Sequence, residues 1–132
     1  MKYFTIKELC FSSTAQAKGV DNTPPGEAIE KLTELTDNVL DPLREWYGKP
    51  IQVNSGYRNQ IVNKLVGSKS ANSQHIKGEA ADITTGSKQE NKKLFNYIKD
   101  NLEYDQLIDE SNFSWIHVSF RKGNNRMQVL SL

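Results

Sequence analysis

Residues 73–82 read Ser-Gln-His-Ile-Lys-Gly-Glu-Ala-Ala-Asp and place the strongest constraint on the path of the chain. His75 and Asp82 are seven residues apart, a separation of about 23 Å in one straight strand and about 10 Å in one helix. Neither geometry allows both side chains to bind one metal ion through bonds of about 2 Å. The chain must therefore reverse between them, and Gly78 permits the reversal. We expect His75 in a loop and Asp82 on the strand that follows.

The surroundings of Asp82 are unusual for a carboxylate. Its neighbours are Ala80, Ala81 and Ile83, and a charge among such residues is costly unless it is paired or bound to a metal ion. A second histidine, His117, lies in an alternating segment. Alternation places Trp115, His117 and Ser119 on one face of a strand and apolar residues on the other.

Two histidines and one carboxylate, with a fourth position left to water, are typical of a catalytic zinc site. One carboxylate leaves the zinc ion with a net positive charge, which favours ionisation of its water. For an arbitrary pair of histidines and one aspartate, the commoner arrangement is a solvated His75, a hydrogen-bonded His117 and an Asp82 that caps a turn or forms a salt bridge. The spacing by itself leaves both interpretations open.

The rest of the chain predicts a mixed fold. Apolar spacings of three and four residues and capping residues predict a short helix after Thr5 and helices over 59–66 and 88–101. They also predict a helix of about 20 residues that opens at Pro24-Pro25 and that Pro42 should kink or split. Strands are predicted over 51–54, 79–84, 104–110, 114–121 and 126–130, the last three as an antiparallel meander, and a loop over 11–26. These elements predict one α+β domain over residues 1–132, a small antiparallel sheet with helices packed on one side.

Composition excludes several classes of protein. The chain has 132 residues, 17 basic and 16 acidic, and a net charge of +1, which argues against a nucleic-acid partner. It contains no apolar run that could span a membrane or form a signal-peptide core, so we expect synthesis in the cytoplasm. The single cysteine, Cys10, excludes thiolate zinc sites and internal disulfides. Residues 111–132 carry three basic and no acidic side chains, a bias that favours a carboxylate-bearing substrate on one face.

Ordered motifs resemble one known family. They are Ser55-Gly-Tyr-Arg58, Asn63, Ser73-x-His75-x-x-Gly78-x-Ala80-x-Asp82 and Trp115-x-His117-Val-Ser119, with flanking similarity in Asp41-Pro-Leu-Arg-Glu, Tyr47-Gly-Lys-Pro-Ile and Asp105-Gln-Leu-Ile. Together they resemble the zinc D-Ala-D-Ala carboxypeptidases and related cell-wall peptidases, in particular the short single-domain bacterial and phage branch that includes endolysins. The resemblance implies the small α+β fold of that family and one zinc ion held by His75, Asp82 and His117.

The resemblance also implies roles for nearby residues. Arg58 matches the family arginine that contacts the substrate and helps to hold the polarised carbonyl, although a structural salt bridge is an alternative for this residue. Ser73 and Ser119 are candidate substrate-binding residues that line the cleft, and a turn-forming or merely exposed serine is the alternative for each.

The general base is where the chain departs from the family pattern. Many members carry Glu or Asp three residues before the last histidine ligand, and here that residue is Ser114, whose hydroxyl cannot accept a proton from water at neutral pH. We predict that Glu110 replaces it, because a short hairpin through residues 111–113 brings Glu110 beside Ser114. An exposed acid at the end of a hairpin is the alternative.

These observations predict a monomeric zinc metallopeptidase that hydrolyses peptidoglycan stem peptides, of carboxypeptidase or endopeptidase type. The expected setting is the cell wall after release from the cytoplasm, as in phage or prophage lysis. Ser114 favours a rival hypothesis, a zinc-bearing module that binds cell-wall peptide without turnover. A metal-free phage structural protein is a third possibility.

Overall fold

The computed structural model describes residues 1–68, 70 and 72–132. Its helical elements are α1 (Ile6–Cys10), α2 (Ser13–Lys18), α3 (Gly26–Leu35), the π-helical turn η1 (Thr36–Leu40), α4 (Asp41–Tyr47), α5 (Gln60–Leu65), α6 (Gln74–Lys77) and α7 (Lys88–Asn101). Its strands are β1 (Gln52–Ser55), β2 (Ala80–Thr84), β3 (Gln106–Glu110), β4 (Trp115–Ser119) and β5 (Gln128–Ser131). Among the described residues, every helix is too short or too polar to cross a lipid bilayer.

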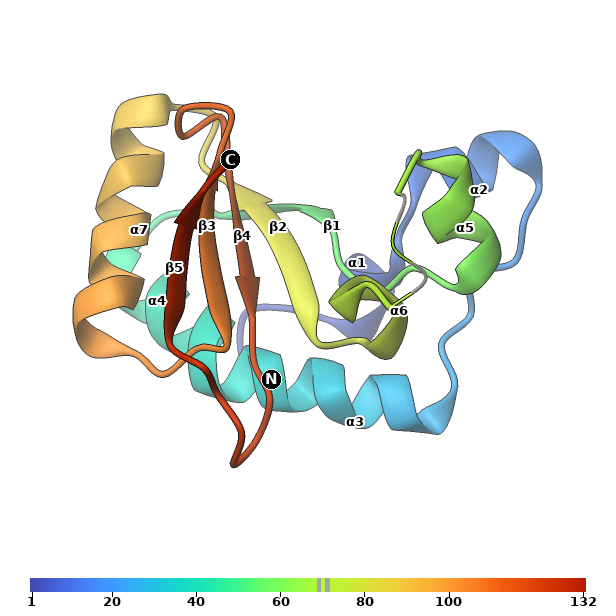
Figure 1. Cartoon of the computed structure of the whole chain (residues 1–132), viewed down its shortest axis with the longest axis horizontal. Coiled ribbons are helices and arrows are strands. Elements are labelled where there is room, and N and C mark those ends of the chain that lie inside the picture. The colour runs from blue at the N-terminus through green and yellow to red at the C-terminus, as the bar shows by residue number, and fades with distance from the viewer. Residues whose placement is uncertain (69, 71) are drawn as a thin grey trace.

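The strands form one sheet in the order β1-β2-β4-β3-β5 (Figure 1). The pairs β1–β2, β2–β4 and β4–β3 are antiparallel, whereas β5 runs parallel to β3. The predicted α+β class with a small, mainly antiparallel sheet is confirmed. The predicted meander is wrong in its last step. Because β4 already pairs with β2 on one edge and with β3 on the other, β5 cannot pair with β4, and it joins the sheet at the outer edge of β3.

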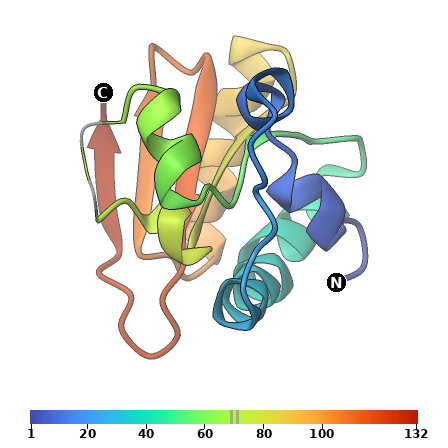
Figure 2. The ribbon, with the colours of Figure 1, turned by 90° about the vertical axis from the view of Figure 1, so that its right-hand side faces the viewer.

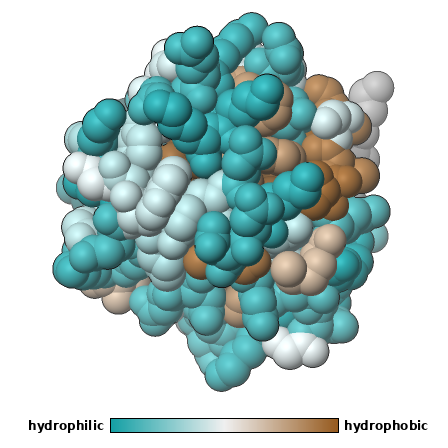
Figure 3. All heavy atoms as spheres, turned by 90° about the vertical axis from the view of Figure 1, so that its left-hand side faces the viewer, coloured by the Kyte–Doolittle hydropathy of each residue, from teal (hydrophilic) through white to brown (hydrophobic). Residues whose placement is uncertain are grey.

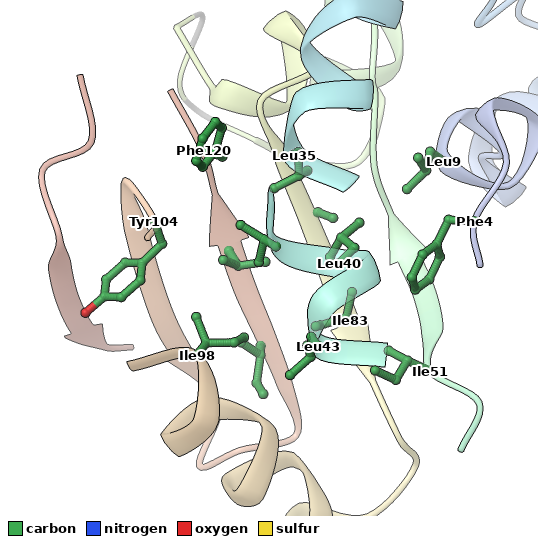
Figure 4. Packing of buried hydrophobic residues seen from close by; sticks show 14 of the residues in the cluster. Phe4, Leu9, Leu35, Leu40, Leu43, Ile51, Ile83, Ile98, Tyr104 and Phe120 are labelled. Atoms are coloured by element: carbon green, nitrogen blue, oxygen red, sulfur yellow. The ribbon is translucent and has the colours of Figure 1, made fainter. Parts of the chain in front are cut away.

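The core lies between one face of the sheet and a layer of helices (Figure 4). Period-two alternation turns Ile83 of β2, Leu107 of β3 and Ile116 of β4 toward this layer, and all three are fully buried. Fully buried leucines of α3, η1, α4 and α7 pack against them, each contributing about 2 kcal/mol of transfer free energy. The opposite face of the sheet is therefore free to carry polar side chains. The short helix α6 approaches this face beside β2, and α5 lies next to α6 (Figure 2).

The long helix predicted from Pro25 is present and is interrupted before Pro42, as expected. Pro42 has no backbone N–H to continue an α-helical ladder. The chain accommodates it with η1, where the Asp41 N–H bonds to the Thr36 carbonyl five residues earlier. The turn lets α3 and α4 follow the sheet as two segments. Most apolar residues stay buried along both, from Leu32 to Leu43, whereas Ile29 and Trp46 near the two ends are exposed.

The outer side of the helix layer is solvated. The face of the molecule that includes α7 is mainly hydrophilic, with hydrophobic side chains in separate patches (Figure 3). On α7 the side chains of Lys92 and Lys99 are exposed, whereas Leu94, Phe95 and Ile98 are buried. The amphipathic helix predicted for residues 88–101 is confirmed, and Ser87 caps it through the Glu90 N–H.

Two short helices occupy segments that the sequence predicts as loops. Residues 11–26 contain α2, which Ser12 caps at its N-terminus and left-handed Gly19 ends. His75 lies in α6 rather than in a loop, because Ser73 accepts a hydrogen bond from the His75 N–H and starts a single helical turn. Neither helix contains two large apolar residues at a spacing of three or four, as α5 does with Ile61 and Leu65, so periodicity does not detect them.

Gly78 reverses the chain between α6 and β2, as predicted. Its φ of 79° is in the left-handed region, and it ends α6 two residues before β2 begins. A Cβ at this position would lie 2.6 Å from the Ala28 carbonyl oxygen of α3. Only glycine therefore allows both the turn and the close approach to α3.

Substitution Gly78→Ala tests this constraint. We expect a loss of about 3 kcal/mol in the free energy of unfolding, from left-handed strain and from the clash with Ala28. Gly123→Ala is the matched control, since Gly123 has a φ of 73° with nothing within 4 Å of the added Cβ. It should cost only about 1 kcal/mol. Urea unfolding measures both, and equal losses would contradict the close packing against α3.

Candidate metal centre

Strand register brings Asp82 and His117 together. Asp82 of β2 pairs directly with His117 of β4, and both side chains lie on the sheet face opposite the core. The Asp82 Oδ1 atom is 3.0 Å from the His117 Nδ1 atom. A one-residue slip of register would turn one of these side chains into the core, so the hydrophobic alternation of the two strands also specifies the polar pair.

His75 reaches the same point from α6. It is buried, and its Nδ1 atom lies 2.7 Å from the Gly56 carbonyl oxygen. Because a carbonyl only accepts hydrogen bonds, this contact assigns the ring proton to Nδ1 and leaves Nε2 with a free lone pair. The Nε2 atom lies 3.4 Å from Asp82 Oδ1. A histidine whose second nitrogen donates to a backbone carbonyl is the arrangement that metal-binding histidines adopt in proteins.

His75, Asp82 and His117 fit a single metal ion. Their candidate ligand atoms all lie within 4.8 Å of one another. Burial raises the pKa of Asp82, but the neighbouring imidazoles of His117 and His75 outweigh it and hold that pKa below its ordinary value. The carboxylate is thus ionised and faces two imidazole nitrogens, a donor set that suits zinc. The structure brings together all three residues that the sequence predicts as ligands.

Arg58 lies beside this group. Its backbone N–H donates to the His75 carbonyl, and its Nη1 donates to the Ser55 hydroxyl. Burial lowers the pKa of Arg58, and the negative charge of Asp82 opposes that shift. The buried Nε atom has no hydrogen-bond partner among the described residues. The residue also lines the cavity described below, and a guanidinium next to a metal-binding group is suited to a carbonyl or carboxylate oxygen of a ligand.

A cavity of about 440 Å³ opens over the three residues. Glu110 and Trp115, which pair with each other across β3 and β4, line it together with Arg58 and Ser73. Glu110 is diagonal to His117 on the same sheet face, a separation of about 7–8 Å that a long side chain can span. Burial raises the pKa of Glu110, the charge of Asp82 raises it further, and His117 opposes both.

The three serines of the sequence prediction have different surroundings. Ser73 lines the cavity and also caps α6. Ser119 is fully buried, is not among the residues that line the cavity, and accepts a hydrogen bond from the Gln106 N–H. Its position therefore serves the pairing of β3 with β4. Ser114 donates its hydroxyl to the Ser111 carbonyl in the hairpin and is likewise not among the lining residues.

A buried acidic pair holds α6 in place, and sequence reasoning missed it. The Gln74 side-chain amide donates to Asp105 at 2.9 Å and to Glu79 at 3.3 Å. Both carboxylates are buried and paired with cations, Asp105 with Arg126 and Glu79 with Lys31. Because Gln74 precedes His75, these bonds orient the helix that presents the histidine. Each acid directly precedes a strand, Glu79 before β2 and Asp105 before β3, and this is the kind of sequence signal that points to the pair.

An ionised aspartate and two histidines that converge in an open cavity, next to a second acid and an arginine, define the site of a metal-dependent hydrolase. A family model described as Peptidase M15 matches residues 2–119. The chain belongs to this family of zinc-dependent metallopeptidases, in agreement with the resemblance in its motifs. No curated protein sequence matches it.

The Asp105–Arg126 pair predicts a specific loss of stability in acid. Hydrogen bonds from Arg126 lower the pKa of Asp105 to about 2 from its ordinary 3.8, against the opposing effect of burial. A lowered pKa in the folded state stabilises the protein above the ordinary pKa, and that contribution disappears as the pH falls through the folded value. The shift corresponds to about 2 kcal/mol.

Urea unfolding at pH 5 and pH 2 measures this contribution. The wild type should lose about 2 kcal/mol more than Asp105→Asn over this interval, since the variant lacks the titrating group while the other carboxylates are common to both proteins. Equal losses in the two proteins would show that Asp105 is not ionised by its contact with Arg126.

Proposed function

We propose that the protein is a zinc peptidase that hydrolyses peptide bonds in peptidoglycan stem peptides. The observation that carries the proposal is the convergence of His75, Asp82 and His117 in a cavity that Glu110 and Arg58 also line. Membership of the Peptidase M15 family supports hydrolysis of a peptide. The cell-wall substrate rests on the similarity of the Ser55–Arg58, Ser73–Asp82 and Trp115–Ser119 motifs to D-Ala-D-Ala carboxypeptidases.

The ligands in this proposal are His75 through Nε2, His117 through Nδ1, and the Asp82 carboxylate. Asp82 Oδ1 lies within 3.4 Å of both nitrogens, and the Gly56 carbonyl keeps His75 in the required tautomer. A bound zinc ion would supply a Lewis acid that polarises the scissile carbonyl and makes water more acidic. The residues around it supply orientation and proton transfer.

Glu110 is the proposed general base. Its carboxylate accepts a proton from the attacking water as the new carbon–oxygen bond forms, and it then donates this proton to the leaving amine nitrogen as the carbon–nitrogen bond breaks. A carboxyl whose pKa is raised by burial is better matched to both halves of this transfer than a fully solvated one. Ser114 stands at the position where relatives carry an acid, and its hydroxyl is occupied by the Ser111 carbonyl.

Arg58 is the proposed group that holds the substrate carbonyl. The negative charge that develops on the carbonyl oxygen requires a donor that is already oriented and shielded from water. The Arg58 guanidinium meets this requirement, because the Ser55 hydroxyl and the His75 carbonyl hold the residue in place while its guanidinium lines the cavity.

Metal binding is tested by substitution of the proposed ligands. Asp82→Asn and His117→Ala should each lower zinc affinity at least about 100-fold, because a loss of one of three protein ligands removes several kcal/mol of binding. Asp109→Asn is the matched control. Asp109 is also an acid of the sheet, but its side chain lies on the face opposite the proposed ligands and accepts a hydrogen bond from Ser131. Competition with a chromophoric chelator measures the affinities. Retention of zinc by both ligand variants would contradict the site.

The base is tested by Glu110→Gln. This variant should keep one zinc ion and lose about 10²–10⁴-fold in kcat on a stem peptide, whereas Asp109→Asn should keep both zinc and turnover. Mass spectrometry of the released fragments gives the rate and also identifies the bond that is cut. Full turnover by Glu110→Gln would overturn the assignment of the base.

The same digestion decides between the peptidase and the rival binding module that Ser114 suggests. A zinc-loaded wild type that releases fragments from purified peptidoglycan supports hydrolysis. A zinc-loaded wild type that binds peptidoglycan and releases nothing contradicts the proposed function and favours the binding module.

A further inference from the structure

The cavity contains a second guanidinium, that of Arg126, which the proposed mechanism does not use. Arg126 lies between β4 and β5 and lines the same cavity as His75, Asp82 and Arg58. Its side chain is 49% exposed, so it is accessible from the cavity and from solvent. It also belongs to the C-terminal segment in which the only charged side chains are basic.

Hydrogen bonds to the buried Asp105 carboxylate fix the orientation of the Arg126 side chain. Nε donates to Asp105 Oδ1 at 2.9 Å and Nη2 donates to Oδ2 at 2.7 Å, while the Arg126 backbone N–H also bonds to Oδ1. Asp105 is fully buried and accepts a further bond from Gln74, so it cannot swing with the arginine. A guanidinium that is otherwise flexible is thus held in one plane.

This contact leaves the other edge of the guanidinium available. A guanidinium has five N–H donors, and Asp105 uses the edge formed by Nε and Nη2. The edge formed by Nη1 and the second N–H of Nη2 has the geometry for a bidentate bond to a carboxylate. Two arginines and two ionisable acids line the cavity, and a metal ion would add positive charge, so the occupied site favours an anion.

The register of β3 places this edge and Glu110 toward opposite ends of the cavity. Ile108 pairs with His117, Glu110 pairs with Trp115, and Gln106 adjoins Asp105 at the opposite end of β3. The step from Ile108 to Gln106 is about 7 Å, which matches about two residues of an extended peptide. Arg126 and Glu110 therefore lie on opposite sides of the metal-binding group along the cavity.

We propose that Arg126 binds a substrate carboxylate one or two residues from the scissile bond. The site then selects peptides that carry a free carboxylate at that place, supplied by the terminal α-carboxylate or by an acidic side chain. This inference rests on the proposed peptidase function and specifies the substrate class of the same site.

Paired peptide substrates test the assignment. The zinc-loaded protein is assayed on a stem peptide with a free C-terminus and on its C-terminal amide, and on a peptide with an acidic side chain and its side-chain amide. The wild type should prefer the acid by about 10–100-fold in kcat/KM, mainly through KM, in one of the two comparisons. The comparison that shows the preference identifies the source of the carboxylate.

The variants separate recognition from folding. Because Arg126→Gln alone would leave Asp105 buried without its cation, the double variant Arg126→Gln with Asp105→Asn is used. Its acid-to-amide ratio should fall to about threefold or less. Arg121→Gln is the matched control, since Arg121 lies in the same basic segment but lines other cavities, and it should keep the wild-type ratio.

The outcomes distinguish this inference from the proposed function. A wild type that cleaves none of the peptides contradicts the peptidase itself. A wild type that cleaves acid and amide equally, or a double variant that keeps the full preference, overturns the role of Arg126 and leaves the peptidase standing.

Discussion

The ionised Asp82 carboxylate between two imidazoles is the interaction on which the rest of the structure depends. A largely buried charge requires partners, and His117 at 3.0 Å and His75 at 3.4 Å supply them from a paired strand and from a separate helix. Satisfying both requires the antiparallel register of β2 with β4 and the reversal at Gly78. The same geometry that offsets the cost of the charge creates the donor set for a metal ion.

The residues behind the site form a second layer of paired charges. Glu79 pairs with Lys31 of α3, Asp105 pairs with Arg126 before β5, and Gln74 bonds to both carboxylates. A buried carboxylate is tolerated only with such partners, so this layer ties three distant segments to the helix that presents His75. Rigid support of this kind keeps metal ligands oriented before the metal and the substrate bind.

Local sequence patterns predicted the helices and strands whose formation depends on neighbouring residues. Capping residues and apolar spacing correctly predicted α1, α7 and the interrupted helix through Pro42, because each depends on contacts within a few residues. The short helices α2 and α6 were missed because neither contains two large apolar residues at helical spacing. The place of β5 could not be predicted from its own residues, since it depends on β4 having both edges occupied.

The sequence by itself determined the candidate metal ligands, because His75, Asp82 and His117 belong to ordered motifs and alternation puts His117 on a polar face. Only the tertiary structure decided which other side chains share the cavity. It includes Glu110 and Arg126 and leaves out Ser119, although alternation along β4 assigns Ser119 to the same face as His117. The physical reason is that cavity walls come from segments far apart in the chain, and strand order and depth of burial have no local signal.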